Sequence, residues 1–310
     1  MAGCSGPQSA LDPAGFEAEK VAALFNVMLG ASAVIWLAVM LLAVVAAYAP
    51  PIAARNARPV IWIGGALVPT VVVGVLLVYG LGLMGPLRAA GDGVRIHVSA
   101  EQYWWRVSYL APDDTVILET ANRLVLPVDV RSDIYLTSPD VIHSFWVPAL
   151  AGKVDAIPGR TNRAVLEPTR EGRYRGQCAE LCGTSHTFMA LDVDVVSEEA
   201  YRAWLARTAE EARDPVTPEE ERGLALFLET GCGACHTIRG TPADGTLGPD
   251  LTDMGSRPTI AAGLFPTNTG TIAGWIADAQ NLKPGNAMPS FDVLPGEDLR
   301  AIAVYLESLE

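Results

Sequence analysis

Hydrophobic and polar residues follow distinct patterns along the chain, and each pattern predicts a different kind of structure. Two long apolar runs, Val21 to Ala49 and Pro59 to Gly85, contain no charged residue. Since about 20 apolar residues are enough to cross a bilayer, both runs predict membrane-spanning helices. Residues 94–196 then alternate apolar and polar residues between Pro and Gly, which is typical of a β-sandwich.

Helical spacing dominates the rest of the chain. Ser197 is a good N-cap followed by two glutamates, and the spacing predicts a helix that extends to about Ala212. Thr217 precedes a proline and an acidic first turn, which is the signature of a second helix start. A last helix is expected from Pro295 to Leu309.

These patterns predict a multidomain protein. The expected divisions are a leader at residues 1–20, a transmembrane helical hairpin at 21–86, an all-β sandwich at 87–200, a helix and linker at 201–217, and an all-α domain at 218–310.

The ends of the hairpin carry signals of orientation. Residues 1–6 resemble the end of a bacterial lipoprotein signal, but no charged and apolar segment precedes Cys4. Cys4 is therefore either a lipidation site in a chain that starts late or a thiol in a leader. Arg55 and Arg58 lie in the short loop between the apolar runs, and basic residues in short loops favour the cytoplasmic side. The residues after 86 are then expected outside the cytoplasm.

Composition narrows the function further. The 310 residues carry a formal net charge of −13, so we expect no nucleic-acid partner. Only four histidines and five cysteines are present, and most of them fall into two clusters. His97 lies outside both clusters in an alternating run, and we expect it to be an ordinary exposed strand residue.

The first cluster occupies residues 178–189, which we call the sulfur loop. Cys178, Cys182, His186 and Met189 offer thiolate, imidazole and thioether ligands, and His143 offers a second imidazole upstream. Such ligands favour copper, zinc or iron–sulfur clusters. A mononuclear blue copper site uses one Cys, whereas two thiolates can bridge two copper ions.

The segments around the sulfur loop are predicted strands, at residues 164–167 and 190–196. A metal loop between two strands is how cupredoxin-like sandwiches hold copper. Two alternatives remain for the same residues. One is a structural zinc site of two Cys and two His, which gives Met189 no role. The other is a disulfide between Cys178 and Cys182, which gives the two histidines no role.

The second cluster is a Cys-x-x-Cys-His motif formed by Cys232, Cys235 and His236. This motif is typical of covalent haem c attachment, although a redox dithiol or half of a zinc site matches the same residues. The iron of such a haem takes a second axial ligand opposite the histidine. For this ligand we favour Met288 over Met254. We expect Met254 to lie on the surface or to pack in the core. A haem iron held by His and Met has a raised potential, which suits a donor to copper.

Together these motifs resemble subunit II of the haem–copper cytochrome c oxidases, fused to a class I cytochrome c. The first resemblance covers roughly residues 15–200 and includes segments 140–145 and 153–160. The second covers residues 218–310 and includes the loop at 248–251. The implied fold is a two-helix transmembrane hairpin, an all-β cupredoxin-like Greek-key sandwich and an all-α cytochrome c domain.

The resemblance also implies the site residues. It assigns a dinuclear copper centre, CuA, to His143, Cys178, the Glu180 carbonyl, Cys182, His186 and Met189. It assigns the covalent haem to Cys232 and Cys235, and its iron to His236 and Met288.

Two further roles follow from the same resemblance. The Glu180 side chain would reach a magnesium ion at the boundary with subunit I. Tyr103 and Trp104 occupy the aromatic segment through which electrons reach CuA in the family, and core packing is the alternative for both residues.

The function implied is that of a bacterial aerobic terminal oxidase in the inner membrane, with both redox domains on the periplasmic side. Electrons would pass from cytochrome c or another basic donor through haem c and CuA to subunit I. Subunit I would reduce oxygen to water with proton translocation, and subunit III would be a further partner. The alternatives are the electron-accepting subunit of a CuA-type nitric oxide reductase and a membrane-anchored copper-binding or assembly protein.

Overall fold

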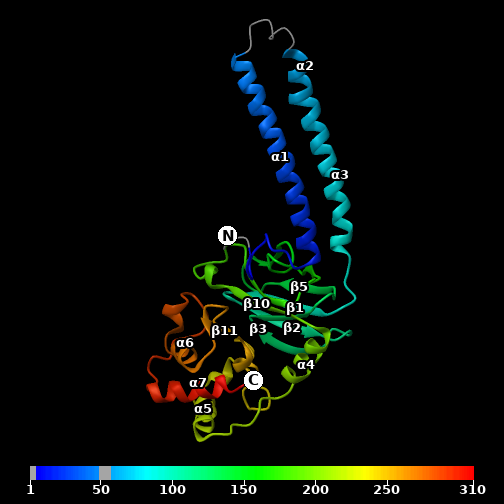
Figure 1. The fold of residues 1–310 in the computed structure, drawn as a ribbon. Helices are drawn as coiled ribbons and strands as arrows, with labels where there is room; N and C mark the ends of the chain where they lie inside the picture. Colours follow the sequence, from blue (N-terminus) through cyan, green and yellow to red (C-terminus); the bar gives the residue numbers. More distant parts are fainter. Residues whose placement is uncertain (1–4, 49–56) are drawn as a thin grey trace. The chain divides into compact units, whose positions relative to one another are not determined.

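The computed structural model describes residues 5–48 and 57–310. The chain forms two compact units, residues 19–89 and residues 1–18 with 90–310, which are described separately here (Figure 1). Cys4 and Arg55, which carried the expectations about lipidation and orientation, lie outside the described residues.

The first unit is helical. It contains most of α1 (Phe16–Tyr48), followed by α2 (Ala57–Trp62), the π-helical turn η2 (Ile63–Leu67) and α3 (Val68–Arg88). Two helical stretches, Phe16–Tyr48 and Arg58–Leu87, have mean hydropathies of 2.5 and 2.4 and are long enough to cross a membrane. Both expected helices are therefore present. The π turn lies just before Pro69, which lacks an N–H group and cannot continue a regular hydrogen-bond ladder.

The second unit contains a sandwich of two five-stranded sheets. One sheet has the order β3-β2-β1-β5-β8, and the other has the order β4-β10-β9-β6-β7. The strands are β1 (Arg95–Glu101), β2 (Trp104–Leu110), β3 (Val116–Ala121), β4 (Arg123–Pro127), β5 (Ser132–Thr137), β6 (His143–Trp146), β7 (Val154–Ala156), β8 (Asn162–Leu166), β9 (Gly172–Cys178) and β10 (Ala190–Val196).

Alternation of side chains explains the core of this sandwich. In β1 every second residue is buried, because successive side chains point to opposite faces of a strand. Trp105, Tyr109 and Phe145 are fully buried between the sheets. The expected β-sandwich is confirmed.

The strand that enters the sulfur loop differs from the expectation. The sequence analysis placed residues 164–167 before the loop, but that segment belongs to β8 in the other sheet. The strand that leads directly into the loop is β9, which pairs antiparallel with β10. Its alternation of Tyr174, Gly176 and Cys178 as buried residues is the signal that could have revealed it.

The helices after the sandwich begin at their predicted caps. The Ser197 side chain accepts from the Ala200 amide at the start of α4 (Glu198–Thr208), which ends earlier than expected. The Thr217 side chain accepts from the Glu220 amide at the start of α5.

Residues 218–310 form what we call the helical domain, which lies beside the sheets (Figure 1). Its elements are α5 (Pro218–Glu229), the 3₁₀ turns η4 (Cys232–Ala234) and η5 (Met254–Ser256), the short strands β11 (Thr259–Ile260) and β12 (Phe265–Pro266), α6 (Thr269–Leu282) and α7 (Gly296–Glu307).

Helices α5 and α7 cross at Gly223, where a Cβ atom would overlap the carbonyl oxygen of Ala301. We expect Gly223→Ala to lower the free energy of unfolding of the helical domain by about 1–3 kcal/mol, because the helices must separate. Gly274→Ala in α6 is the matched control, since nothing lies within 4 Å of a Cβ there. The control should gain roughly 0.5–1 kcal/mol from helix propensity. Denaturant unfolding of the haem-loaded chain measures both, and equal effects would contradict the crossing.

Candidate metal centre

The sulfur loop begins at the end of β9 and returns at the start of β10. The Cys178 amide donates to the Met189 carbonyl at 2.9 Å, which closes the loop at its base. Cys178 and Cys182 are buried free thiols whose Sγ atoms lie 3.8 Å apart. A disulfide needs about 2.05 Å between its sulfurs, so the structure does not contain the disulfide alternative.

Other soft and polar ligands surround the two thiols. On one side, His143 Nδ1 lies 3.8 Å from Cys178 Sγ, and the Glu180 carbonyl oxygen lies 3.2 Å from the same sulfur. On the other side, His186 Nδ1 lies 3.6 Å and Met189 Sδ lies 4.0 Å from Cys182 Sγ. The structure thus brings together all six residues that the sequence analysis assigned to copper.

The orientation of His143 depends on a residue that the sequence analysis did not single out. An oxygen of Asp140 lies 2.8 Å from His143 Nε2, which holds the proton on Nε2 and leaves Nδ1 free to bind a metal. His143 is fully buried, so the ring has no water to satisfy Nε2 instead. A carboxylate three residues before a candidate ligand was the sequence signal for this role.

The two thiols do not lose their protons equally. Burial raises the pKa of Cys178, but the hydrogen bond with His143 and backbone amide contacts outweigh it and hold the pKa below its ordinary value. Burial and the neighbouring Cys178 raise the pKa of Cys182. The metal-free pair therefore resists losing both protons, and a bound cation is what favours the double thiolate.

The helical domain presents the second donor set. Cys232 and Cys235 are free thiols at the turn η4, and the His236 amide donates to the Cys232 carbonyl at 3.0 Å. His236 Nδ1 lies 2.8 Å from the Pro249 carbonyl oxygen, which leaves Nε2 for an iron. Burial lowers the pKa of His236, which favours the neutral imidazole that binds metals.

The loop at Gly248 passes close to the His236 ring. A Cβ atom on Gly248 would lie 2.5 Å from the imidazole, so only glycine lets the loop pass this close. Met288 packs, partly buried, against the apolar cluster of the helical domain. Met254 is buried in the same cluster, in agreement with the packing role expected for it. These residues suit a covalently attached haem.

The two aromatic candidates for electron uptake occupy different environments. Tyr103 is buried, and its carbonyl oxygen accepts a hydrogen bond from Lys283 of the helical domain. Trp104 is half-buried beneath the guanidinium of Arg106, which lies 4.7 Å from the ring centre. Arg106 also donates to the Thr246 carbonyl of the helical domain at 2.9 Å. Both aromatics therefore lie next to the helical domain.

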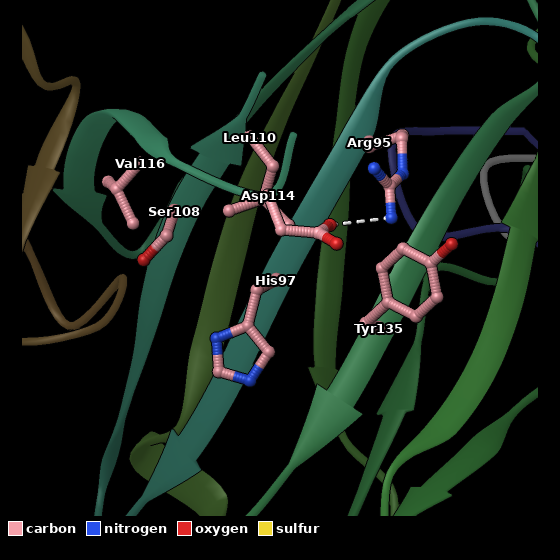
Figure 2. A pocket seen from close by; sticks show the side chains of 7 residues that line it. All are labelled: Arg95, His97, Ser108, Leu110, Asp114, Val116 and Tyr135. Carbon is pink, nitrogen blue, oxygen red and sulfur yellow. Dashed lines mark ion pairs between the residues drawn. The ribbon is translucent and has the colours of Figure 1, made fainter. Parts of the chain in front are cut away.

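His97 was expected to be exposed, and that expectation is wrong. It is half-buried in a hollow of about 460 Å³ on the outer face of β1, β2 and β5 (Figure 2). Its Nε2 atom lies 2.8 Å from the Thr137 hydroxyl, and burial lowers its pKa. Arg95, in the same hollow, pairs with Asp114 and stacks over Tyr135. Neighbouring strands in the sheet cover His97, which the alternation within one strand does not reveal.

A sulfur-rich loop in a β-sandwich and a Cys-x-x-Cys-His segment in a helical domain are typical of multidomain electron-transport proteins. Sequence families make the assignment specific. The family described as cytochrome C oxidase subunit II, periplasmic domain, matches residues 92–196, and the cytochrome c family matches residues 220–310. Residues 92–196 therefore belong to the cytochrome c oxidase subunit II periplasmic-domain family and residues 220–310 to the cytochrome c family, as the sequence analysis expected.

Individual relatives agree with this assignment. Cytochrome c oxidase subunit 2 of Alkalihalophilus pseudofirmus is 37% identical over 226 residues, which is 73% of this chain and 64% of the relative. The corresponding protein of Bacillus subtilis is 31% identical over 235 residues, which is 72% of this chain and 64% of the relative. The chain thus spans somewhat less than two thirds of the length of these relatives.

A solved structure is similar to part of the chain. The periplasmic domain of subunit II of cytochrome oxidase from Bradyrhizobium japonicum is 31% identical. The match covers 39% of this chain and 95% of that domain, with a TM-score of 0.36.

The Asp140–His143 pair gives a test of the site. We expect Asp140→Asn to weaken copper binding by about 10- to 100-fold, because the amide no longer holds the imidazole proton on Nε2 as firmly. Asp113→Asn is the matched control, since Asp113 lies in an exposed turn and bonds only Thr115 among the described residues. Competition with a copper chelator measures both affinities. Equal affinities would show that Asp140 does not orient the ligand.

Proposed function

We propose that this chain is subunit II of a bacterial aerobic terminal oxidase. One observation carries the proposal: a donor set suited to copper and a Cys-x-x-Cys-His segment suited to haem c lie in adjoining domains of one compact unit. When bound, the two groups would supply one-electron transfer from an external donor to the catalytic subunit I, where oxygen is reduced to water with proton translocation.

The copper donors favour a dinuclear centre. His143, Cys178 and Cys182 have ligand atoms within 4.8 Å of one another, and His186 is not in that group. His186 instead approaches Cys182 from another side. A single tetrahedral zinc ion would need all four residues around one point. Two copper ions would use the whole set: the thiolates of Cys178 and Cys182 with the imidazoles of His143 and His186, completed by Met189 and the Glu180 carbonyl.

The four candidate haem residues would have two different roles. Cys232 and Cys235 would form the thioethers, and His236 and Met288 would bind the iron. His236 is held by the Pro249 carbonyl, so its ring direction is fixed before haem is attached. This suits a centre that must change charge without moving its ligands.

Glu180 is suited to a second role in a magnesium site at the boundary with subunit I. Its carbonyl oxygen faces Cys178, while its carboxylate is 47% exposed and 3.9 Å from the ammonium of Lys153. The next residue, Leu181, is 79% exposed. A carboxylate beside an exposed apolar side chain fits a surface that another subunit covers, and we assign that surface to subunit I.

The remaining partners follow from the helices and the charge. The apolar helices would place the chain in the bacterial inner membrane, with both redox domains on the periplasmic side and subunit III as a further neighbour. Residues 218–310 carry 5 basic and 13 acidic side chains, a formal charge of −8, which would attract a basic donor such as a cytochrome c. The relatives are oxidase subunits by name, which favours oxygen over nitric oxide as the acceptor.

Electron paramagnetic resonance tests the copper assignment. We expect the haem-matured, copper-loaded chain to show one electron shared over two copper ions, with one copper pair per haem. Cys182→Ser should abolish the shared-electron signal, because one bridging thiolate is lost, while the haem spectrum stays unchanged. Thr187→Ser, an exposed hydroxyl exchange in the same loop, is the control. A mononuclear copper signal in the unaltered chain would overturn the dinuclear centre and the relay built on it.

A further inference from the structure

The helical domain is fastened directly onto the sulfur loop. Ser185, which precedes the candidate ligand His186, is fully buried and donates its hydroxyl proton to the Pro284 carbonyl at 2.7 Å. The Ala190 amide, which follows Met189, donates to the Ala262 carbonyl at 3.0 Å. Both ends of the segment that carries two candidate copper ligands are thus hydrogen-bonded to the helical domain.

Lys283 lies at the centre of this contact. Its side chain is 2% exposed, and its ammonium donates to the Tyr103 carbonyl at 2.7 Å and to the Ala261 carbonyl at 2.8 Å. Burial lowers the pKa of Lys283 to about 7. Burial of a cation costs free energy unless hydrogen bonds or an ion pair compensate for the lost water. The bond to Tyr103 joins the sandwich to the helical domain, and the bond to Ala261 fixes the ammonium within the helical domain.

The residues around Lys283 connect the two donor sets by a short route. Pro284 follows Lys283 directly, and Met288, the candidate iron ligand, lies four residues further on. From Pro284 a single hydrogen bond reaches Ser185, and the next covalent neighbour is His186. A second route runs from Tyr103 to Gln102, whose side-chain Nε2 donates to the Cys182 carbonyl at 2.5 Å.

We propose that Lys283 is a positioning residue for electron transfer, which holds the Met288 segment of the helical domain against the sandwich, next to the sulfur loop, through the Tyr103 carbonyl. The inference rests on the proposed function. With both groups bound, haem held by Cys232, Cys235, His236 and Met288 would supply one electron to copper held by the sulfur loop and His143, the haem being oxidised and the copper reduced by one electron with no bond made or broken. Tunnelling weakens steeply with separation, so the interface must stay closed. The same contact covers Tyr103, so an external donor reaches the copper through the haem and not through this aromatic.

The test compares Lys283→Met with Arg300→Met in the assembled oxidase. The methionine keeps the apolar stem but removes the ammonium. Arg300 is a cation of the helical domain, and its ion-pair partner, Glu219, lies in the same domain. Two readouts are needed: the rate of haem-to-copper electron transfer after light-triggered reduction of the haem, and hydrogen exchange at the Ala190 amide in the full chain before copper loading.

We expect Lys283→Met to slow the transfer and to speed exchange at Ala190, each by about tenfold, which corresponds to the net loss of about one hydrogen bond. Arg300→Met should change neither, and the haem and copper spectra should be unaltered in both variants. Ser185→Ala, which removes the neighbouring hydrogen bond, should have the same direction of effect and serves if Lys283→Met fails to fold.

Two results would overturn the proposal. If Lys283→Met left both the exchange rate at Ala190 and the electron-transfer rate unchanged, Lys283 would not hold the two domains together. Faster exchange with an unchanged transfer rate would make it a merely structural contact. If the unaltered chain itself moved no electron from haem to copper, the proposed relay would fall instead, and exchange at Ala190 would still decide whether Lys283 holds the interface closed.

Discussion

The close approach of two thiols within the sulfur loop is the constraint on which the rest of the structure depends. At 3.8 Å, two thiolates repel each other strongly unless cations lie between them. Three strands hold the arrangement: β6 supplies His143, β9 ends at Cys178, and β10 starts directly after Met189. A rigid sheet below a short loop holds the candidate ligands in place, so in the proposed centre little rearrangement of the chain would be required when the charge changes.

In the proposed relay, the helical domain has the complementary role of an attached electron donor. A donor that diffuses must find the copper site at each turnover, whereas a donor on the same chain has an effective concentration set by its tether. Here the tether is supplemented by direct hydrogen bonds to the sulfur loop and by Thr120, whose hydroxyl donates to the buried carboxylate of Asp253. The helical domain is thus held against the sandwich by hydrogen bonds as well as by the covalent linker.

Local features of this structure were predictable from the sequence, and non-local ones were not. The spacing from Cys178 to Met189 predicts a single loop, and the caps at Ser197 and Thr217 start their helices, because each signal lies within a dozen residues. By contrast, a lysine before a Pro-Gly turn reads as a surface residue. The burial of Lys283 depends on carbonyls distant in sequence, at Tyr103 and Ala261. Half-burial of His97 likewise depends on strands that pair from elsewhere in the chain.

The buried contact between the helical domain and the sandwich has a consequence for the effect of dissolved salt. Exposed charges separated by more than about 10 Å are screened at 0.1 M ionic strength, whereas hydrogen bonds excluded from water are not. In the proposed relay, capture of a basic donor depends on the acidic surface of residues 218–310 and so weakens as salt rises. The internal step across Lys283 and Ser185 proceeds at the same rate in dilute and concentrated salt. The fusion thereby separates a step that responds to the medium from one that does not.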